Sequence, residues 1–288
     1  MRPLKLAVPN KGRLSDDSLA VLRRAGIHLR GSSERRLFAT ALDGRIQVLF
    51  LRAADIPAFV ADGAVDAGIT GLDVTLESGL DLHVRTDLGF GRCRLVVAVP
   101  EGAPWRSPED LPDGVRLATS FPNLTKSYFR DLGKHVRIIP VSGACEVTPT
   151  IGVADAITDL TSSGSTLVMN HLREVGTIAT STCHLVTAPT VDPEVAENLE
   201  RIVFALESVI DARDQRYLLA DLPRAALGEV RSFLPGLAGP TVVEIAGDPD
   251  TVAIQVVVQE DQIFDAVHRL RALGGRGILV VPIDRMVA

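Results

Sequence analysis

Cysteine is scarce in this sequence, and its spacing fits neither a disulfide framework nor a zinc site. Three cysteines occur among 288 residues, an odd number, and no two of them form a C-x-x-C pair. The six histidines are scattered, without the H-x-x-x-H or H-E-x-x-H spacing of a metal-binding helix. We therefore expect reduced, mostly structural thiols and no metal cage built by the protein alone.

Long hydrophobic runs and an excess of positive charge are also missing. Apolar runs such as 95–99 and 256–258 are far too short to span a bilayer, and the first residues lack the apolar core of a signal peptide. The net charge of −6 argues against nucleic-acid binding, which usually needs a basic face. A small polyanionic substrate is still compatible, because backbone N–H groups and a few local cations can bind phosphate. These features predict a cytoplasmic protein without a membrane or nucleic-acid partner.

The apolar content, 46% of residues, is sufficient for two or three compact units. Residues 4–8 alternate as a strand does, residues 9–13 break the pattern, and Ser15 offers an N-cap for a helix that ends at Gly26. A similar strand–loop–helix unit is predicted over residues 115–133.

A second pair of segments, residues 64–73 and 153–160, also looks alike, and both pairs occur in the same order. This recurrence predicts two related α/β lobes. The apolar strand 93–100 is expected to cross from one lobe to the other, and the chain to cross back near 184–189. A helix over 193–214 then leads out. A cleft between two lobes is the usual place for a ligand.

The last 75 or so residues read in the order β-α-β-β-α-β of a ferredoxin-like unit. The expected strands are 217–222, 241–246, 252–258 and 278–283, and the expected helices 224–233 and 263–270. This unit contains no obvious reactive constellation, so regulation or assembly is its predicted role.

The most informative local segment is the loop 159–167, which follows a strand ending at Leu160 and leads into a helix near Thr166. Gly164 allows the backbone to approach a ligand, and N–H groups at a helix start favour phosphate. Hydroxyls are available from Thr161, Ser162, Ser163, Ser165 and Thr166. The other interpretation is a solvated turn with an N-cap. The loop is neither a Walker A motif nor a G-x-G-x-x-G fingerprint.

Asp155 and Asp159 are four residues apart, so on a strand they project to one face. They could accept hydrogen bonds from ribose hydroxyls or hold a hydrated Mg²⁺ against a diphosphate. They could equally be exposed carboxylates at a strand end.

The segment around these residues resembles that of a known family, the ATP phosphoribosyltransferases, which catalyse the first step of histidine biosynthesis. Matches to the family's signature segment are Glu146, Gly152, Ala154, Ile157, Asp159, Leu160, Ser163, Gly164, Thr166 and Leu167. The resemblance also covers residues 6–14, 51–57, 68–73 and 118–125, and the last unit resembles the extra domain of the family's long form.

The resemblance implies an α/β fold: a two-lobed core like that of periplasmic binding proteins, followed by a ferredoxin-like, ACT-like α+β domain. Lobe I is then expected over residues 1–92 and 185–212, lobe II over 93–184, and a regulatory domain over 213–288.

The resemblance further implies a Mg²⁺-dependent displacement, in which N1 of ATP attacks phosphoribosyl pyrophosphate to give phosphoribosyl-ATP and pyrophosphate. The Mg²⁺ is expected to arrive on the substrate. The implied catalytic cations are Lys11, Arg13 and Arg52. The nucleotide is assigned to Gly12, Leu72, Asp73, Thr119 and Ser120. Phosphoribosyl pyrophosphate is assigned to Asp155, Asp159, Thr161, Ser162, Ser163, Gly164, Ser165 and Thr166.

For the last domain, the resemblance implies feedback inhibition by L-histidine bound between neighbouring subunits, and a homo-oligomer, as dimer and hexamer. The matching residues are Asp221, Leu237 and Thr241. Asp221 could instead cap the helix expected near Arg224.

Three other functions remain open at this point. A non-catalytic two-lobed protein that binds an anion or nucleotide for regulation would have the same lobes. An inactive paralogue would have lost substrate contacts, yet Lys11, Arg52 and Gly164 are all present. A salvage phosphoribosyltransferase would normally carry two adjacent acidic residues before its loop, where this chain has Thr158 and Asp159.

Overall fold

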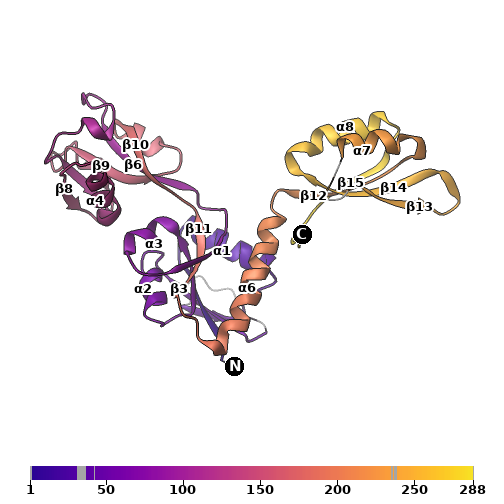
Figure 1. The fold of residues 1–288 in the computed structure, drawn as a ribbon, viewed down its shortest axis with the longest axis horizontal. Coiled ribbons are helices and arrows are strands. Elements are labelled where there is room, and N and C mark those ends of the chain that lie inside the picture. Colours follow the sequence, from indigo (N-terminus) through magenta and orange to yellow (C-terminus); the bar gives the residue numbers. More distant parts are fainter. Residues whose placement is uncertain (1, 31–36, 42, 235, 237–238, 288) are drawn as a thin grey trace. The chain divides into compact units, whose positions relative to one another are not determined.

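The computed structural model describes residues 2–30, 37–41, 43–234, 236 and 239–287 (Figure 1). The chain divides into two compact units. Unit 1 comprises Met1–Arg23 and Ile27–Val203, and unit 2 comprises Arg24–Gly26 and Phe204–Ala288. No helix in the described part of the chain is long and apolar enough to cross a membrane.

Lobe I of unit 1 is built on a six-stranded sheet in the order β2-β3-β1-β4-β11-β5. Strands β3, β1 and β4 are parallel, whereas β11 is antiparallel to both of its neighbours. The strands are β1 (Leu4–Pro9), β2 (Phe38–Thr40), β3 (Ile46–Leu51), β4 (Ala67–Gly71), β5 (His83–Asp87) and β11 (Cys183–Thr187), and the helices are α1 (Arg13–Arg24), α2 (Ile56–Ala61) and α3 (Leu72–Ser78). All five residues of β4 are buried, as expected for a parallel strand covered on both faces.

Lobe II is built on a five-stranded sheet in the order β10-β6-β9-β7-β8, in which β9, β7 and β8 are parallel. Its strands are β6 (Cys93–Pro100), β7 (Arg116–Thr119), β8 (Arg137–Pro140), β9 (Ala156–Thr161) and β10 (Leu172–Ser181). Its helices are α4 (Pro122–Asp131) and α5 (Ser165–Met169), with short 3₁₀ turns η1 (Pro108–Asp110) and η2 (Cys145–Val147).

The segments that look alike in the sequence occupy equivalent places in the two lobes. Strand β1 pairs with β4 in lobe I, and β7 pairs with β9 in lobe II, both in parallel. Each of these strands leads into a helix. The expectation of two related α/β lobes is therefore confirmed.

Two chain segments connect the lobes. The first leads into β6 at Cys93, and the second is the single residue Thr182 between β10 and β11. The return crossing thus lies a little before the expected residues 184–189, because β11 already pairs with β4 from Cys183 onward.

The start of α1 differs from the expectation. The helix begins at Arg13 rather than after Ser15. Gly12 adopts a φ of +79°, and the N–H of Ser15 donates to the Gly12 carbonyl at 3.0 Å. Ser15 is therefore already inside the first turn, where its side chain is buried.

Unit 2 has the order β12-α7-β13-β14-α8-β15, and its antiparallel sheet has the order β13-β14-β12-β15. Its strands are β12 (Gln215–Pro223), β13 (Thr241–Ile245), β14 (Asp248–Gln259) and β15 (Arg276–Pro282), and its helices α7 (Leu227–Phe233) and α8 (Ile263–Ala272), with 3₁₀ turns η3 (Arg224–Ala226) and η4 (Glu260–Gln262). Helix α6 (Pro193–Asp211) leads into this unit. The predicted ferredoxin-like order is confirmed.

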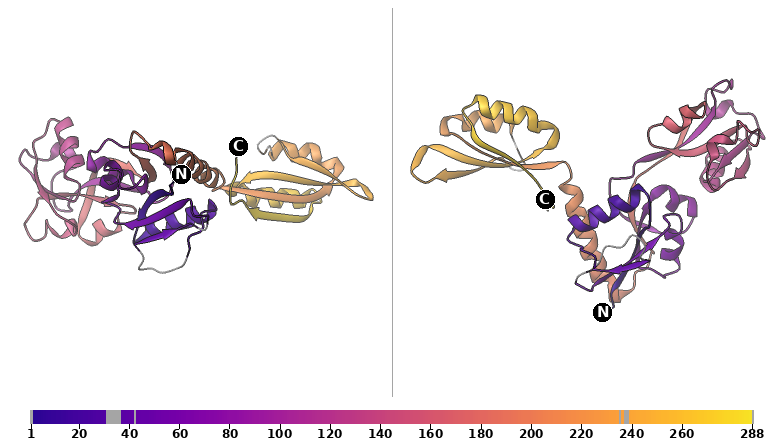
Figure 2. Two further views of the ribbon diagram at one scale, coloured as in Figure 1. Left: turned by 90° about the horizontal axis from the view of Figure 1, so that it is seen from below. Right: turned by 180° about the vertical axis from the view of Figure 1, so that it is seen from behind.

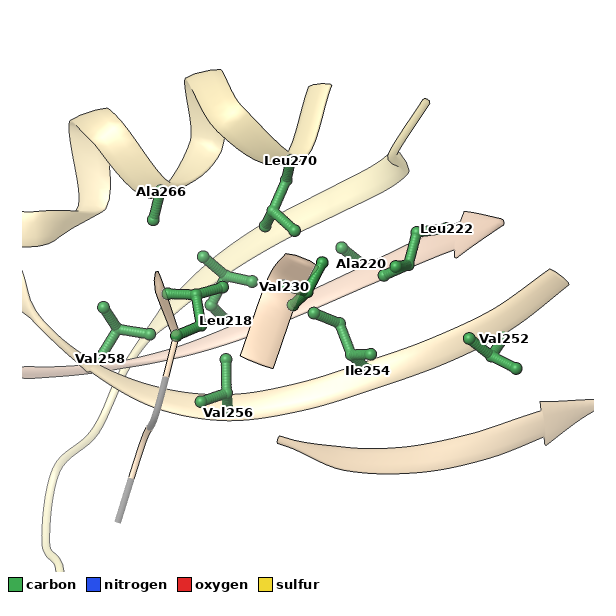
Figure 3. Packing of buried hydrophobic residues seen from close by; sticks show 11 residues of the cluster. Leu218, Ala220, Leu222, Val230, Val252, Ile254, Val256, Val258, Ala266 and Leu270 are labelled. Carbon is green, nitrogen blue, oxygen red and sulfur yellow. The ribbon is translucent and has the colours of Figure 1, made fainter. Parts of the chain in front are cut away.

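The core of unit 2 lies between its sheet and its two helices (Figure 3). Leu218 and Leu222 of β12 and Ile254 of β14 point toward Val230 of α7 and Leu270 of α8, and all are essentially inaccessible to solvent. Both helices lie on one face of the sheet, and further views of the same unit show the opposite face uncovered by any helix of the unit (Figure 2). Side chains that alternate with the buried ones, such as Asp221, therefore belong to the open face.

Candidate active site

The loops after the parallel strands carry most of the residues singled out in the sequence. In lobe I these loops follow β1, β3 and β4, and in lobe II they follow β7 and β9. Ligands of open α/β sheets bind beyond the carboxyl ends of the strands. These two sheet edges are therefore the candidate site.

Hydrogen bonds hold the lobe I loops together. The N–H of Asn10 donates to the carbonyl of Leu51 at 2.7 Å, which ties the β1 loop to the end of β3. The hydroxyl of Thr70 donates to the carbonyl of Ala53 at 2.9 Å, which ties the β3 loop to the end of β4. The three loops thus form one edge.

Two cations lie on this edge of lobe I. Lys11 and Arg52 are exposed, and neither side chain makes an ion pair with any residue in the described part of the chain. Gly12, also exposed, gives the turn its positive φ. The backbone of Arg13 starts α1, but its side chain lies outside the described part of the structure. Unpaired cations at a sheet edge are suited to a polyanion.

Asp73, which was expected to contact the nucleotide, holds α3 to the connection between the lobes. Its side chain is buried at the first turn of α3. The hydroxyl of Ser181 donates to Asp73 Oδ1 at 2.6 Å and accepts the Asp73 N–H at 2.9 Å. The neighbouring Leu72 is half-buried and donates its N–H to the Thr182 carbonyl. The sequence does not indicate that Ser181 bonds to Asp73, because the two residues are 108 positions apart along the chain.

In lobe II, the loop after β9 is shaped by Thr161. This side chain is buried, and its hydroxyl accepts the N–H of Gly164 at 2.8 Å. Gly164 has a φ of +80°, and a side chain built on it would meet no atom within 4 Å. The hydroxyls of Ser163 and Ser165 are 2.9 Å apart, and Ser162, Ser163, Ser165 and Thr166 are all exposed. The loop therefore presents four hydroxyls, while Thr161 acts on the loop itself.

Asp159 lies half-buried on β9 beside this loop. Burial raises the pKa of its carboxyl above the ordinary value, and the nearby charge of Glu146 raises it further. The N–H of Leu160 donates to Asp159 at 2.8 Å and acts in the opposite direction, as does the thiol of Cys145. Burial likewise raises the pKa of Cys145, to about 12, so this thiol stays protonated as a donor. Glu146, a residue of the signature segment, is therefore close enough for its charge to act on Asp159.

The structure separates Asp155 from Asp159. Asp155 immediately precedes β9, at the amino end of that strand. Arg116 is the first residue of the neighbouring strand β7. The guanidinium of Arg116 donates to both carboxylate oxygens, at 2.7 and 3.1 Å, and this pairing lowers the pKa of Asp155. Asp155 is thus a structural partner at the opposite sheet edge, which corrects its expected place beside the phosphoribosyl loop.

Thr119 is also withdrawn from the exposed edge. It is fully buried, its hydroxyl accepts the N–H of Phe121 at 2.9 Å, and Thr125 and Thr158 lie in the same buried cluster, with their hydroxyl oxygens 2.6 Å apart. Ser120, the residue after β7, is exposed. Of the expected pair, Ser120 alone presents its side chain to solvent.

In unit 2, two of the residues expected to bind histidine, Asp221 and Thr241, lie on the open face of the sheet. Asp221 lies near the end of β12 and pairs with Ala253, while Thr241 begins β13 and pairs with Gln255. Leu237 lies outside the described residues. The turn η3 makes no side-chain cap hydrogen bond at its N-cap, Pro223, so Asp221 does not cap the following helix.

Metal binding by side chains alone finds no support in the described residues, which contain no group of three or more His, Cys, Asp or Glu side chains suited to an ion. Mg²⁺ commonly binds one or two carboxylates together with substrate phosphates, and Asp159 offers a carboxylate beside the hydroxyl-rich loop.

The sequence matches two family models. Residues 52–208 match the model described as ATP phosphoribosyltransferase, and residues 212–285 match the model described as HisG, C-terminal domain. The second match coincides with unit 2 beyond α6.

Curated relatives and a solved structure agree with these matches. The ATP phosphoribosyltransferase of Gemmatimonas aurantiaca is 50% identical over 99% of both chains, and that of Methanocaldococcus jannaschii is 46% identical over 99% of this chain and all of the relative. A chain of the ATP phosphoribosyl transferase (HisG:HisZ) complex from Thermotoga maritima superposes with a TM-score of 0.63 at 32% identity, covering 72% of this chain and 98% of that chain. The present chain therefore belongs to the ATP phosphoribosyltransferases, the pentosyltransferases that catalyse the first step of histidine biosynthesis.

Proposed function

We propose that unit 1 transfers the 5-phosphoribosyl group of phosphoribosyl pyrophosphate to N1 of ATP, in the cytoplasm. The observation that carries the assignment is the pairing of a half-buried carboxylate, Asp159, with the hydroxyl-rich loop at the carboxyl end of β9. The carboxylate is suited to ribose hydroxyls, and the hydroxyls and N–H groups of the loop are suited to the 5-phosphate. Family membership identifies the substrates.

The chemistry requires positioning and charge stabilisation more than proton transfer. Adenine N1 carries a free electron pair, which forms the new bond to the anomeric carbon while the bond to pyrophosphate breaks. Positive charge develops on the ribose and negative charge on the departing pyrophosphate. Asp159 faces the ribose in this arrangement, and Lys11 and Arg52 supply positive charge from lobe I.

Mg²⁺ is the cofactor of this proposal. The ion would arrive with the diphosphate of the substrate, and Glu146 and Asp159 would contribute carboxylates to it. When bound there, the ion neutralises charge on the pyrophosphate group. Asp159 and the loop after β9 orient the ribose of the substrate.

The test of this function is direct product detection. Purified full-length protein is mixed with ATP, phosphoribosyl pyrophosphate, Mg²⁺ and pyrophosphatase, and phosphoribosyl-ATP is measured by liquid chromatography and mass spectrometry. We expect product with ATP and none with adenine or guanine in its place. Product from a free base would instead indicate a salvage enzyme. Folded protein that binds ATP but forms no product would favour the non-catalytic regulatory protein.

For unit 2 we propose regulation by L-histidine. The observation in its favour is a carboxylate, Asp221, on the open face of the four-stranded sheet of this unit, with Thr241 on the same face. A carboxylate there can pair with the cationic groups of the amino acid. We also propose a homo-oligomer, as dimer and hexamer, because the ligand would then lie between open faces of neighbouring subunits. Light scattering with and without histidine measures this assembly.

An Asp221→Asn variant is expected to need about 10- to 100-fold more histidine for half-inhibition, because a hydrogen bond to a charged group is lost. Its activity without histidine should equal that of the parent. The matched control is Asp261→Asn, an exposed carboxylate of the same unit on η4. Equal histidine sensitivity in both variants would remove Asp221 from the regulatory site.

A further inference from the structure

Helix α3 is fixed at its first turn to the connection between the lobes. The N–H of Leu72 donates to the carbonyl of Thr182, and Asp73 exchanges two hydrogen bonds with Ser181. Ser181 ends β10 and Thr182 links it to β11, so the first turn of α3 is bonded to the return crossing and to the residue just before it. The start of α3 therefore keeps its place relative to that crossing.

At its other end, α3 contacts helix α4 of lobe II through Glu77. One carboxylate oxygen accepts the N–H of Asn123 at 2.9 Å, and the other accepts the N–H of Leu124 at 2.9 Å. The side-chain amide of Asn123 donates to the backbone carbonyl of Glu77, also at 2.9 Å. Three hydrogen bonds thus join the two lobes at one point.

The sequence of α4 explains why it accepts a cap from another lobe. Its N-cap residue is Phe121, which makes no side-chain cap hydrogen bond, and its first residue is Pro122, which has no N–H. The N–H groups of Asn123 and Leu124 are therefore left without a local acceptor. A carboxylate is the preferred group at such a position, because it accepts both hydrogen bonds and interacts favourably with the helix dipole.

A cap supplied by the other lobe depends on how the lobes are oriented. Rotation of lobe II away from this position breaks all three hydrogen bonds at once, whereas the internal hydrogen bonds of each lobe remain. The cap therefore stabilises one orientation selectively. This orientation also sets the position of Ser120 relative to lobe I, because the loop that carries Ser120 runs directly into α4.

We propose that Glu77 is a positioning residue for phosphoribosyl transfer, which caps α4 from lobe I and so holds the two lobes in the orientation that the reaction needs. This inference rests on the proposed function, since the transfer joins a nucleotide held beside lobe I to a phosphoribosyl group held by lobe II. Glu77 itself touches neither reacting atom.

The first arm of the test measures orientation without activity. Spin labels at Asp62→Cys and Lys126→Cys, both exposed and one on each lobe, report the distance between the lobes by pulsed electron paramagnetic resonance. We expect one narrow distribution in the labelled parent and a broader or longer one after Glu77→Ala. The control Asp81→Ala removes an exposed carboxylate that follows α3 and should leave the distribution unchanged.

The second arm measures kinetics on unlabelled full-length protein. Glu77→Ala is expected to lower kcat about 2- to 30-fold, the range that a lost helix cap supports. The Kd for phosphoribosyl pyrophosphate alone should stay within twofold, because the loop after β9 that is assigned to this substrate lies wholly in lobe II. Glu77→Gln keeps the side-chain size and one acceptor oxygen, and should give an intermediate kcat. It also serves if the alanine variant fails to fold.

The outcomes are distinguishable. An unchanged distance distribution in Glu77→Ala, or a kcat equal to that of the parent, would overturn the positioning role. A parent protein that forms no phosphoribosyl-ATP would refute the proposed function instead, and the distance measurement would still decide whether Glu77 orients the lobes.

Discussion

An Asp159→Asn variant is expected to unfold at a higher temperature than the parent, yet to lose about 100-fold in kcat/KM. The stability gain follows from the raised pKa of this carboxyl, since burial and the neighbouring charge of Glu146 disfavour its ionised form. The loss of activity follows from the replacement of a charged acceptor of ribose hydroxyls by a neutral one. The measurements are calorimetry of the full chain and steady-state kinetics with varied phosphoribosyl pyrophosphate.

The pH dependence of stability should distinguish the contribution of Asp159 from that of Asp155. A carboxyl whose pKa is raised on folding stabilises the protein below its unfolded pKa, and this contribution is lost as pH rises through the folded-state pKa. The parent should therefore lose stability relative to Asp159→Asn from about pH 4 upward. The pKa of Asp155 is lowered by Arg116, so its contribution is present above the unfolded pKa and is lost as pH falls.

Asp155→Asn is the matched control, four residues away on the same segment. It should unfold at a slightly lower temperature near neutral pH, because the pair with Arg116 is weakened, and it should keep its activity. The two variants are thus expected to differ in the sign of both effects. A reversal, in which Asp155→Asn is inactive and Asp159→Asn fully active, would place the ribose at the other edge of the sheet.

The sequence predicts the features that depend on local pattern. The order of elements in unit 2 follows from alternating apolar residues, and the loop 159–167 follows from a strand, a glycine and a run of hydroxyls. The boundaries agree within a few residues: α6 ends at Asp211 instead of 214, and α5 starts at Ser165 instead of Thr166. Turn chemistry explains the three-residue difference at the start of α1, because Gly12 allows the helix to begin early.

Pairing between distant residues could not be predicted in this way. Arg116 is 39 residues from Asp155, Asn123 is 46 from Glu77, and Ser181 is 108 from Asp73. From the sequence, Asp155 and Asp159 are equally good candidates for the site. The structure distinguishes them, because Asp155 is paired with Arg116. Hydroxyls are ambiguous for the same reason: those of Thr119 and Thr161 bond to backbone N–H groups, while those of Ser120 and Ser163 remain exposed.

The second large effect is expected at Gly164, whose φ of +80° lies in the left-handed region. A β-branched side chain is disfavoured there by about 1–2 kcal/mol, so Gly164→Val should force the loop out of its conformation and raise the KM for phosphoribosyl pyrophosphate about 5- to 30-fold. Open space surrounds this position, so backbone strain, and not a clash, is the cause.

Gly164→Asn separates strain from bulk. Asparagine tolerates the left-handed conformation, and its side chain is close to valine in size, so we expect a KM much nearer to that of the parent. Both variants should keep the KM for ATP, because the loop belongs to lobe II. If valine and asparagine raise the KM equally, the space above Gly164 is needed by the substrate itself, and the glycine then serves close approach of the phosphate instead of loop geometry.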